Sequence, residues 1–515
     1  MSAAPPPALE LRGITKRFGA VLANDGVSLT AEAGEVHGIV GENGAGKSTL
    51  MGVLYGAYQA ELGTILLDGH PVALRDSGAA IRAGIAMVHQ HFTLVDPLTV
   101  LENVVLGLEG GPMLRGGLAQ ARAELGRIER DYRLQVNPDA VVGDLPVGAR
   151  QRVEILKALY RGARVLILDE PTAVLTPQEA DELFRILGTL RREGRTVLLV
   201  THKLREVMAV TDQVTVLRAG RVVACRNTRD TNPAELGELM IGRRLAAPAA
   251  KRDHPTGEVV LEAKGVTVRD GAGRSLLDDV SFNLRRGEIV GVAGVAGNGQ
   301  GELLEALSAM RPPDAGTIRL RGETVFPGSR FTPRALRRTG VAHVPEDRLR
   351  TGLVPGAPAM EAAILGYQDD QAWRRGPLLD WRAVERDTLA WMRGHDVRPA
   401  NPRLRADGFS GGNQQKLILA RELEHRPEIL LVGQPTRGVD VGGISLIHER
   451  LLAMREAGGA VLLVSVELDE ILHLADRILV MAGGRIVGEM AARDADERRI
   501  GLLMAGHGMN GVEAA

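Results

Sequence analysis

Eight consecutive residues have the composition and spacing needed to hold a chain of phosphate groups. Residues 41–48 read Gly-Glu-Asn-Gly-Ala-Gly-Lys-Ser and fit the pattern G-x-x-x-x-G-K-[ST]. Glycines let the backbone curl so that successive N–H groups point at phosphate oxygens. The lysine would reach the β- and γ-phosphates, and the serine hydroxyl would hold Mg²⁺. The residues expected to contact a nucleotide here are Gly41, Glu42, Asn43, Gly44, Ala45, Gly46, Lys47, Ser48 and Thr49.

The segments on either side of this loop are those that the pattern requires. Residues 35–40 read as a short buried strand, and residues 49–55 read as the start of a helix. The N-terminus of such a helix adds partial positive charge to the N–H groups of the loop. A glycine-rich turn with a chance lysine is the alternative, because so short a pattern also arises by luck. Residues further along the chain decide between the two.

Two carboxylates follow a second apolar run. Residues 165–168 are Val-Leu-Ile-Leu, and Asp169 and Glu170 come directly after them. The run predicts a buried parallel strand, and an open α/β sheet binds its ligand at the carboxyl ends of such strands. Asp169 would hold Mg²⁺, and Glu170 would orient or deprotonate an attacking water. The alternative is an ordinary strand end with acidic turn residues.

Three more strand ends carry side chains that suit a nucleotide. His202 follows the apolar residues 197–200 and is a candidate for contact with the γ-phosphate. Gln90 ends the predicted strand at 85–90. Phe18, near an early strand end, is a candidate for stacking on an adenine ring. A single aromatic residue or a lone histidine more often has a packing role, so the weight of these candidates comes from their positions.

The composition fits a globular protein of two domains. The chain has 515 residues, 44% hydrophobic and 25% charged, and a formal net charge of −1. The protein therefore has no excess of positive charge that would attract nucleic acid. Cys225 is the single cysteine of the sequence, so no internal disulfide is possible. The first residues lack a signal-peptide pattern, and no apolar run approaches about 18 residues. We expect a cytoplasmic, soluble protein that docks onto a membrane partner.

The sequence repeats once, at a period near half its length. The segments at 9–15, 38–41 and 171–172 recur at 261–267, 291–294 and 435–436. A stretch of alanine, proline and charged residues near 245–255 lacks apolar periodicity, as linkers do. We therefore predict a first domain at 8–243, a linker at 244–257 and a second domain at 258–507. Each half alternates short apolar runs with helical patterns, which predicts an α/β domain with a largely parallel sheet.

The ordered set of motifs resembles that of ABC-type ATPases over nearly the whole chain. The matching residues are the Walker A loop at 41–48, the Q-loop glutamine Gln90, the Walker B pair Asp169 and Glu170, the switch histidine His202 and the adenine-stacking Phe18. The resemblance implies ATP and Mg²⁺ as ligands, with Ser48, Gln90 and Asp169 around the metal and Glu170, His202 and Gln90 in catalysis. It also implies two tandem P-loop ATPase domains, each with a helical subdomain and an antiparallel β part beside the parallel sheet.

The family's signature loop, Leu-Ser-Gly-Gly-Gln, has a close match only in the second half. There, residues 409–416 contain Ser410, Gly411 and Gly412, whereas the first-half counterpart at 145–149 has Pro146, which offers neither hydroxyl nor N–H. The second copy has in turn lost the Walker groups. Its replacements are Gln300 for Lys47, Gly301 for Ser48, Gly433 for Asp169, Gln434 for Glu170, Val466 for His202, Glu346 for Gln90 and Asp270 for Phe18.

In this family two nucleotide domains pair head to tail, and each site joins the Walker loops of one domain to the signature loop of the other. The resemblance therefore implies one hydrolytic site, which joins the first Walker set to the second signature loop, and one degenerate site. Copy two would not hydrolyse a nucleotide, although its backbone N–H groups leave weak binding open. Ser410, Gly411 and Gly412 join the predicted nucleotide-binding residues.

Two finer resemblances narrow the family. Residues 344–348 (VPEDR) and 434–440 (QPTRGVD) resemble the ATPases of ribose-type sugar importers, and residues 87–92 with 294–300 resemble the nucleoside branch. The resemblance implies a peripheral protein on the cytoplasmic face of the inner membrane. Its partners would be two integral membrane permease subunits and, indirectly, a solute-binding lipoprotein or periplasmic receptor, without nucleic acid. The alternatives are a soluble twin-ATPase translation factor and a non-transport ATP-binding regulator.

Overall fold

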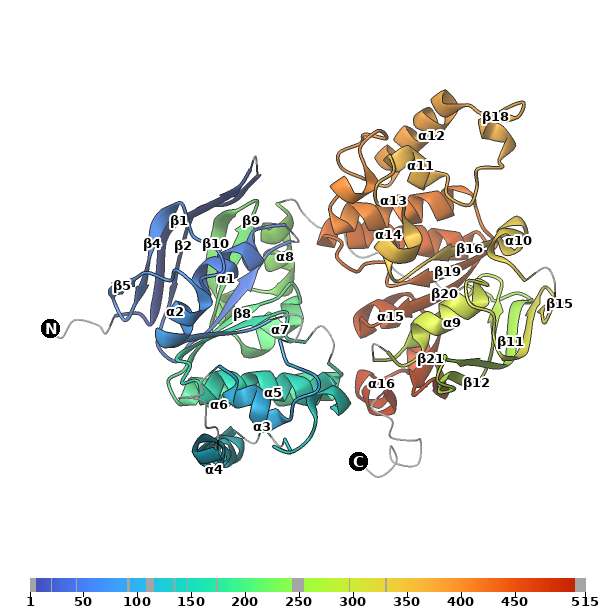
Figure 1. Ribbon diagram of the computed structural model, residues 1–515. Coiled ribbons are helices and arrows are strands. Elements are labelled where there is room, and N and C mark those ends of the chain that lie inside the picture. Colours follow the sequence, from blue (N-terminus) through green and yellow to red (C-terminus); the bar gives the residue numbers. More distant parts are fainter. Residues whose placement is uncertain are drawn as a thin grey trace. The chain divides into compact units, whose positions relative to one another are not determined.

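The computed structural model describes residues 6–19, 21–42, 44–89, 93–107, 115–132, 134, 136–145, 147–172, 175–242, 254–295, 297–328 and 331–504. Contacts divide the chain into two compact units, Met1–Leu245 (unit 1) and Ala246–Ala515 (unit 2). Unit 1 runs from blue to green in Figure 1, and unit 2 from yellow to red. The predicted domain limit at 243 lies among undescribed residues, whereas the limit at 258 lies in the described run that begins at 254, and both stay predictions.

A six-stranded sheet forms the centre of unit 1 within its described residues, in the order β10-β9-β3-β8-β7-β6. Five strands are parallel, and β10 pairs antiparallel with β9. The strands are β3 (Val36–Val40), β6 (Ile85–Val88), β7 (Val165–Asp169), β8 (Thr196–Val200), β9 (Gln213–Arg218) and β10 (Arg221–Asn227). Every residue of β3, β7 and β8 is buried, as expected for apolar strands covered on both faces.

An antiparallel sheet of four strands, in the order β2-β1-β4-β5, lies beside the parallel one. Its strands are β1 (Leu9–Phe18), β2 (Val21–Ala31), β4 (Leu62–Leu67) and β5 (His70–Val72). Helix α1 (Lys47–Leu54) packs in the hydrophobic core shared by the two sheets, where Leu50 and Met51 are fully buried beside Ile39 and Ile167. The phosphate loop thus begins at a buried strand and ends at a buried helix.

The remaining helices of unit 1 cover the parallel sheet and form a helical part (Figure 1). They are α2 (Ser77–Arg82), α3 (Val100–Val105), α4 (Arg115–Tyr132), α5 (Val147–Tyr160), α6 (Pro177–Arg192), α7 (Leu204–Val210) and α8 (Pro233–Ile241). Capping boxes start α3 at Thr99 and α6 at Thr176. Leu101, Leu125 and Leu156 join α3, α4 and α5 in one core.

Unit 2 repeats this architecture. Its six-stranded sheet has the order β16-β19-β20-β13-β21-β22, and its antiparallel sheet has the order β12-β11-β14-β15. The main strands are β11 (Val259–Arg269), β12 (Ser275–Arg285), β13 (Ile289–Ala293), β14 (Ala315–Leu320), β15 (Glu323–Phe326), β16 (Val341–Val344), β19 (Ile429–Gly433), β20 (Ala460–Ser465), β21 (Arg477–Ala482) and β22 (Arg485–Ala491). The helices are α9 (Gln300–Leu307), α10 (Pro333–Arg338), α11 (Ala359–Ala363), α12 (Trp381–Gly394), α13 (Gly411–Glu424), α14 (Val441–Glu456), α15 (Leu468–Leu474) and α16 (Glu497–Met504). The predicted tandem α/β fold is confirmed.

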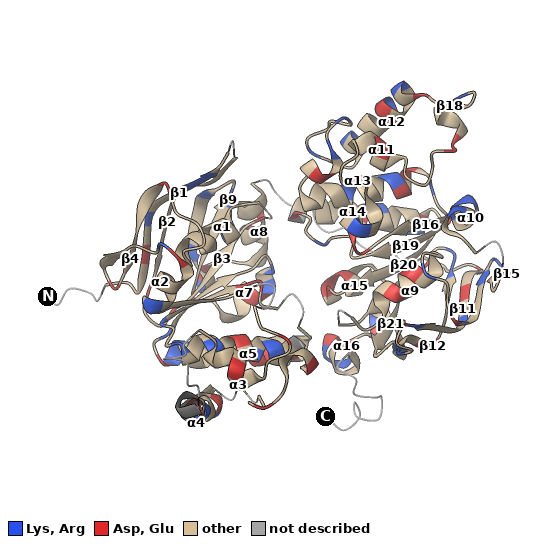
Figure 2. Cartoon of the chain, viewed as in Figure 1, with Lys and Arg blue, Asp and Glu red and all other residues tan. Residues whose placement is uncertain are grey.

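Lys and Arg residues alternate with Asp and Glu residues along the elements of each unit (Figure 2). Among the described residues, no helix combines the length and the apolar character that crossing a bilayer requires.

Candidate functional site

The backbone of the phosphate loop is fixed by its glycines and by strand β2. Gly46 adopts φ 98° and caps α1, and Gly44 adopts φ 83°. A Cβ on Gly46 would collide with the carbonyl oxygen of Ala23. The buried Asn24 of β2 donates from Nδ2 to the carbonyl oxygen of Gly46 over 3.1 Å. The predicted helix start at Thr49 is two residues late, because Gly46 already caps the helix and Lys47 is its first residue.

Lys47 lies across the loop that precedes it. Its Nζ donates to the carbonyl oxygens of Gly41 at 2.6 Å and Glu42 at 3.0 Å, and the side chain is only 6% exposed. Burial lowers the pKa of Lys47, and the negative charges of Glu170, Asp169 and Glu42 oppose that shift. An ammonium group therefore stands between the loop and the two acidic strand-end residues, as the phosphate-binding pattern predicts.

Asp169 is the last residue of β7, paired with Val200 of β8 at the carboxyl end of the sheet. Its carboxylate accepts a side-chain hydrogen bond from Ser48, and burial, with the nearby charge of Glu170, raises its pKa to about 6. The two oxygen donors thus meet at one point beside Lys47. No group of three or more His, Cys, Asp or Glu side chains in the described part of the chain suits a metal ion. This donor set fits Mg²⁺, which proteins hold by one or two side chains together with substrate phosphates.

The raised pKa of Asp169 predicts a pH limit on magnesium-dependent ATP binding. Below pH about 6 the proton neutralises the carboxylate and competes with the cation, so Mg²⁺ affinity should fall about tenfold per pH unit. Binding of ATP should need progressively more Mg²⁺ between pH 7 and 5, as a magnesium titration at each pH would measure. Asp169→Asn should lose most of the affinity and keep only the weaker pH dependence that protonation of the terminal phosphate of ATP contributes. A Mg²⁺ requirement that stays constant down to pH 5 would contradict the assignment.

Glu170 and His202 form a pair at the ends of adjacent strands. His202 Nδ1 lies 3.0 Å from Glu170 Oε1, and the Glu170 N–H donates to the carbonyl oxygen of Val200 over 2.8 Å. Glu170 has a left-handed backbone, φ 48°, which a non-glycine residue adopts at a cost. The hydrogen bond to His202 is the largest cause that lowers the pKa of Glu170, although burial opposes it. Glu170 is therefore a carboxylate at neutral pH, with its direction fixed by His202.

Three polar residues next to the Glu170–His202 pair have a structural role that the sequence analysis does not predict. The buried Glu206, in the first turn of α7, accepts hydrogen bonds from Thr172 and, at 3.0 Å, from Thr201. Thr201 Oγ1 also accepts from the N–H of Lys203 at 3.0 Å. These contacts tie the segment after β7 to the segment that carries His202. The recurrence of Pro-Thr in both halves was the available signal for Thr172, whereas Glu206 resembles an ordinary helix-start acid.

The structure places Phe18 at the end of β1, where its side chain is exposed. Its ring meets the Tyr58 ring edge-on at 5.1 Å, Lys16 Nζ lies 5.2 Å from its centroid, and the residue is 43% exposed. An aromatic pair, rather than Phe18 alone, thus marks the predicted adenine position. The predicted residues Asn43 and Gln90 lie outside the described residues.

The signature residues belong to unit 2. Ser410 caps helix α13, and its Oγ accepts a hydrogen bond from Asn413 Nδ2 over 2.8 Å. Gly411 and Gly412 are the first residues of α13, whose free N–H groups suit a phosphate group. Gly412 is buried, and a Cβ there would lie 2.8 Å from the carbonyl oxygen of Gly438. Ser410, unlike Gly412, is exposed.

At the positions equivalent to the Walker residues of unit 1, unit 2 has the same backbone conformation but different side chains. Gly299 adopts φ 99° and Gln434 φ 48°, as Gly46 and Glu170 do in unit 1. Gln300 Nε2 donates to the carbonyl oxygen of Val295 over 3.1 Å, the position that Lys47 uses on Glu42. Gln434 Oε1 accepts from the N–H of Val466 at 3.2 Å. Neither amide carries a charge or titrates at neutral pH.

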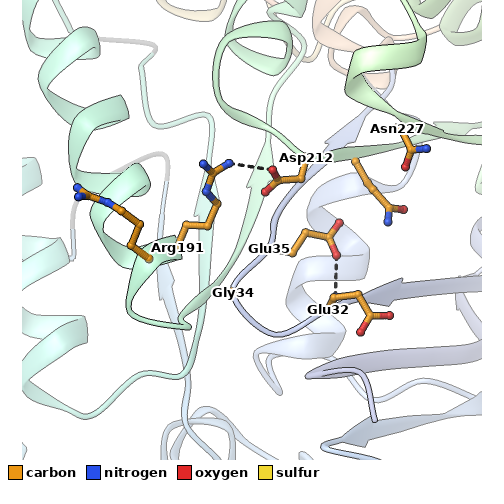
Figure 3. Close-up of a pocket in the computed structure, with 8 residues that line it drawn as sticks. Glu32, Gly34, Glu35, Arg191, Asp212 and Asn227 are labelled. Atoms are coloured by element: carbon orange, nitrogen blue, oxygen red, sulfur yellow. Dashed lines mark hydrogen bonds and ion pairs between the residues drawn. The ribbon is translucent and has the colours of Figure 1, made fainter. Parts of the chain in front are cut away.

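A pocket of about 440 Å³ lies elsewhere in unit 1 (Figure 3). Its lining residues are Glu32, Gly34, Glu35, Arg191, Arg192, Asp212, Gln213 and Asn227. Glu35 and Asp212 directly precede β3 and β9, so the pocket opens at the end of the sheet opposite to Asp169. In unit 2 the side chain of Arg477, the counterpart of Gln213, donates to Glu288 at the equivalent place. The pocket is therefore separate from the phosphate site, and in unit 2 an arginine–glutamate pair stands at this place.

Comparisons with known proteins agree with this geometry. The family described as ABC transporter matches residues 24–173 and 277–437. The guanosine import ATP-binding protein NupO of Bacillus subtilis is 44% identical over 97% of both chains. The nucleoside import ATP-binding protein NupA of Lactococcus lactis is 42% identical over 98% of this chain and 99% of that one. The ribose import ATP-binding protein RbsA 1 of Rubrobacter xylanophilus is 42% identical over 97% and 98%.

Among solved structures, the archaeal ribosome recycling factor aABCE1, in complex with the stalk protein aP1, aligns with 96% of this chain and 92% of its own. The TM-score is 0.62 and the identity 19%. At this identity the likeness shows the shared fold alone.

Proposed function

Because this chain belongs to the ABC transporter family, we propose that it energises the uptake of a nucleoside or a simple sugar. It is an ATPase subunit that couples ATP hydrolysis to transport. The names of the relatives, which specify guanosine, nucleoside and ribose import, support this solute class. They do not favour a translation factor or a non-transport regulator.

The partners are membrane permeases. We propose two integral membrane permease subunits, with a solute-binding lipoprotein or periplasmic receptor delivering the solute to them and no role for nucleic acid. The chain would act as a peripheral protein on the cytoplasmic face of the inner membrane. Its solute never touches it, so solute identity is a property of the permeases and the receptor.

The chemistry is proposed to take place in unit 1. The observation that carries this assignment is the Glu170–His202 pair at 3.0 Å, at the carboxyl end of the strands that face Lys47. Lys47 and the loop N–H groups would bind the β- and γ-phosphates of ATP, and Phe18 with Tyr58 the adenine. Ser48 and Asp169, with Gln90, would hold Mg²⁺, which neutralises charge that develops on the phosphates.

Glu170 would position the water that attacks the γ-phosphate. Its lowered pKa makes it a weak base, so an orienting role, with the carboxylate accepting a hydrogen bond from the water, fits it better than full proton abstraction. His202 would hold the carboxylate in place and approach the γ-phosphate from the end of β8. Phosphoryl transfer needs mainly such positioning and charge stabilisation.

The signature residues Ser410, Gly411 and Gly412 are proposed to complete this site, and unit 2 is proposed not to hydrolyse ATP. This proposal is supported by the way in which the retained functional residues are divided between the two units. Unit 1 has the Walker side chains and lacks the signature serine, whereas unit 2 has the serine and lacks the Walker side chains. We also keep 8–243, 244–257 and 258–507 as the proposed domain limits.

Uptake by the assembled transporter tests the proposal. The chain would be purified with permeases encoded beside it and placed in lipid vesicles with the receptor. We expect ATP-dependent accumulation of labelled nucleosides or ribose, and its loss in Glu170→Gln. ATP hydrolysis that responds to ribosomes, with no uptake of either solute class, would contradict the proposal.

Gln434→Glu should not create a second active site. Gly433 would still bind no metal, Gln300 would bring no charge, and Val466 has no imidazole to approach the γ-phosphate as His202 would. Phosphate release per chain should therefore stay within experimental error of the wild type. A doubling of the rate would show that unit 2 needs only a carboxylate to hydrolyse ATP.

A further inference from the structure

A carboxylate enters the phosphate site of unit 2 from the segment after β16. Glu346 stands two residues beyond Val344, the last residue of β16, where the first copy has Gln90 after β6. The side chain is partly buried and accepts a hydrogen bond from the side chain of Gln434. Gln434 is itself 7% exposed and fixed by the N–H of Val466. The position of Glu346 is therefore fixed by the end of β16, which precedes it, and by Gln434, which follows the end of β19.

Two glycines leave the space that Glu346 fills. A Cβ on Gly301 would lie 2.9 Å from Glu346 Oε2, and a Cβ on Gly433 would lie 2.6 Å from Glu346 Cγ. Both distances are too short for an undisturbed contact, so a side chain at Gly301 would displace the Glu346 carboxylate, and one at Gly433 would also meet Leu304 Cδ1 at 2.7 Å. Gly301 and Gly433 are the counterparts of Ser48 and Asp169. Glu346 thus occupies the place where unit 1 gathers its oxygen donors for Mg²⁺.

The surroundings of Glu346 also lack the lysine that balances the carboxylates of the first site. Burial and the neighbouring Glu302 and Glu305 raise the pKa of Glu346, while Gln434 and Arg437 oppose that shift. Glu302 lies in the first turn of α9, where unit 1 has Thr49. Glu346, Glu302 and Glu305 thus place negative charge near the loop that would face a triphosphate, and Gln300, unlike Lys47, supplies no positive charge against them.

We propose that Glu346 acts as an internal plug that excludes the magnesium–nucleoside triphosphate complex from the phosphate loop of unit 2. The loop keeps its nucleotide-binding backbone, but this carboxylate fills the metal position, in the space that Gly301 and Gly433 leave open. Weak binding through the backbone N–H groups is therefore blocked, and each chain binds one ATP. The inference rests on the proposed function of unit 1 and extends it to the stoichiometry of nucleotide binding.

Equilibrium dialysis of labelled ATP with Mg²⁺ on the full chain tests the plug. Wild type should bind one ATP per chain, and Lys47→Ala, which disables the first loop, should bind almost none. In the Lys47→Ala background, Gln300→Lys alone should restore little, because the new ammonium pairs with Glu346. Gln300→Lys with Glu346→Gln should raise the association constant at least about tenfold, since a buried like charge is removed.

Glu346→Gln keeps the shape of the side chain and an amide oxygen for Gln434, and circular dichroism would confirm folding. Glu323→Gln, which removes one exposed carboxylate on β15, is the matched control and should have no effect. Two ATP per wild-type chain would overturn the plug. Equal binding with Gln300→Lys alone and with the double variant would do the same, as would no binding in the double variant. Wild type that binds no ATP at all would instead contradict the proposed function.

Discussion

Replacing Glu170 with glutamine should leave ATP binding nearly intact while turnover falls by a factor of about 10² to 10⁴. Glutamine has the size of glutamate and still reaches His202, so the strand ends should keep their geometry. Its amide offers the attacking water a weaker acceptor without negative charge. Lys47, Ser48 and Asp169, which hold the phosphates and the metal, stay unchanged. Binding of labelled ATP and release of phosphate would be measured on the same preparation.

Glu182→Gln is the matched control for this substitution. Glu182 is a carboxylate of α6 in the same unit, 3.4 Å from Arg152, and it lies away from the phosphate loop. It should leave both binding and turnover at the wild-type level. If Glu170→Gln turned over ATP at the wild-type rate, Glu170 would have no part in positioning the water.

Ser410→Ala should lower ATP turnover about 10²-fold although Ser410 lies in the other unit from Lys47. In the proposed site the serine hydroxyl and the first N–H groups of α13 stabilise charge on the γ-phosphate, and loss of one such donor typically costs about 10² to 10³ in rate. Within the part of the chain that the structure describes, its hydroxyl makes one hydrogen bond, to the side chain of Asn413, so the fold of α13 should survive. Pro146→Ser, the reverse change at the counterpart in unit 1, should not raise the rate.

Alanine at Ser410 is a cleaner probe than aspartate at the signature glycines. A Cβ on Gly412 would press on Gly438, and a Cβ on Gly148, its counterpart, would collide with Glu179 of the capping box on α6. An aspartate at either glycine therefore disturbs local packing as well as charge. Wild-type turnover in folded Ser410→Ala would show that unit 2 contributes no hydroxyl to the hydrolytic site.

The sequence predicted the parts of the site whose chemistry dictates residue type and spacing. A phosphate loop needs glycines, a lysine and a hydroxyl in fixed order, so residues 41–48 can be recognised from the sequence without knowledge of the fold. Asp169 and Glu170 were placed by the apolar run before them, because carboxyl ends of parallel strands meet at one edge. The structure places Lys47, Asp169, Glu170 and His202 close together at that edge.

Other parts depend on contacts between residues far apart in the chain, which a local pattern does not contain. Tyr58 reaches Phe18 from beyond α1, and Glu206 reaches Thr172 from α7. Glu346 was identified only as a replacement for Gln90. That its side chain needs the space left by Gly301 and Gly433 appears only when three separate segments are folded together.

The central claim is that one of the two phosphate loops hydrolyses ATP, and the same substitution at the equivalent position of each loop tests it most directly. Lys47→Ala and Gln300→Ala would be compared with wild type for phosphate release by the assembled transporter, with folding checked by circular dichroism. Lys47→Ala should lose at least about 10² in rate because the charge that faces the triphosphate is gone, whereas Gln300→Ala should stay within about twofold. Equal loss in the two folded variants would contradict a single hydrolytic site.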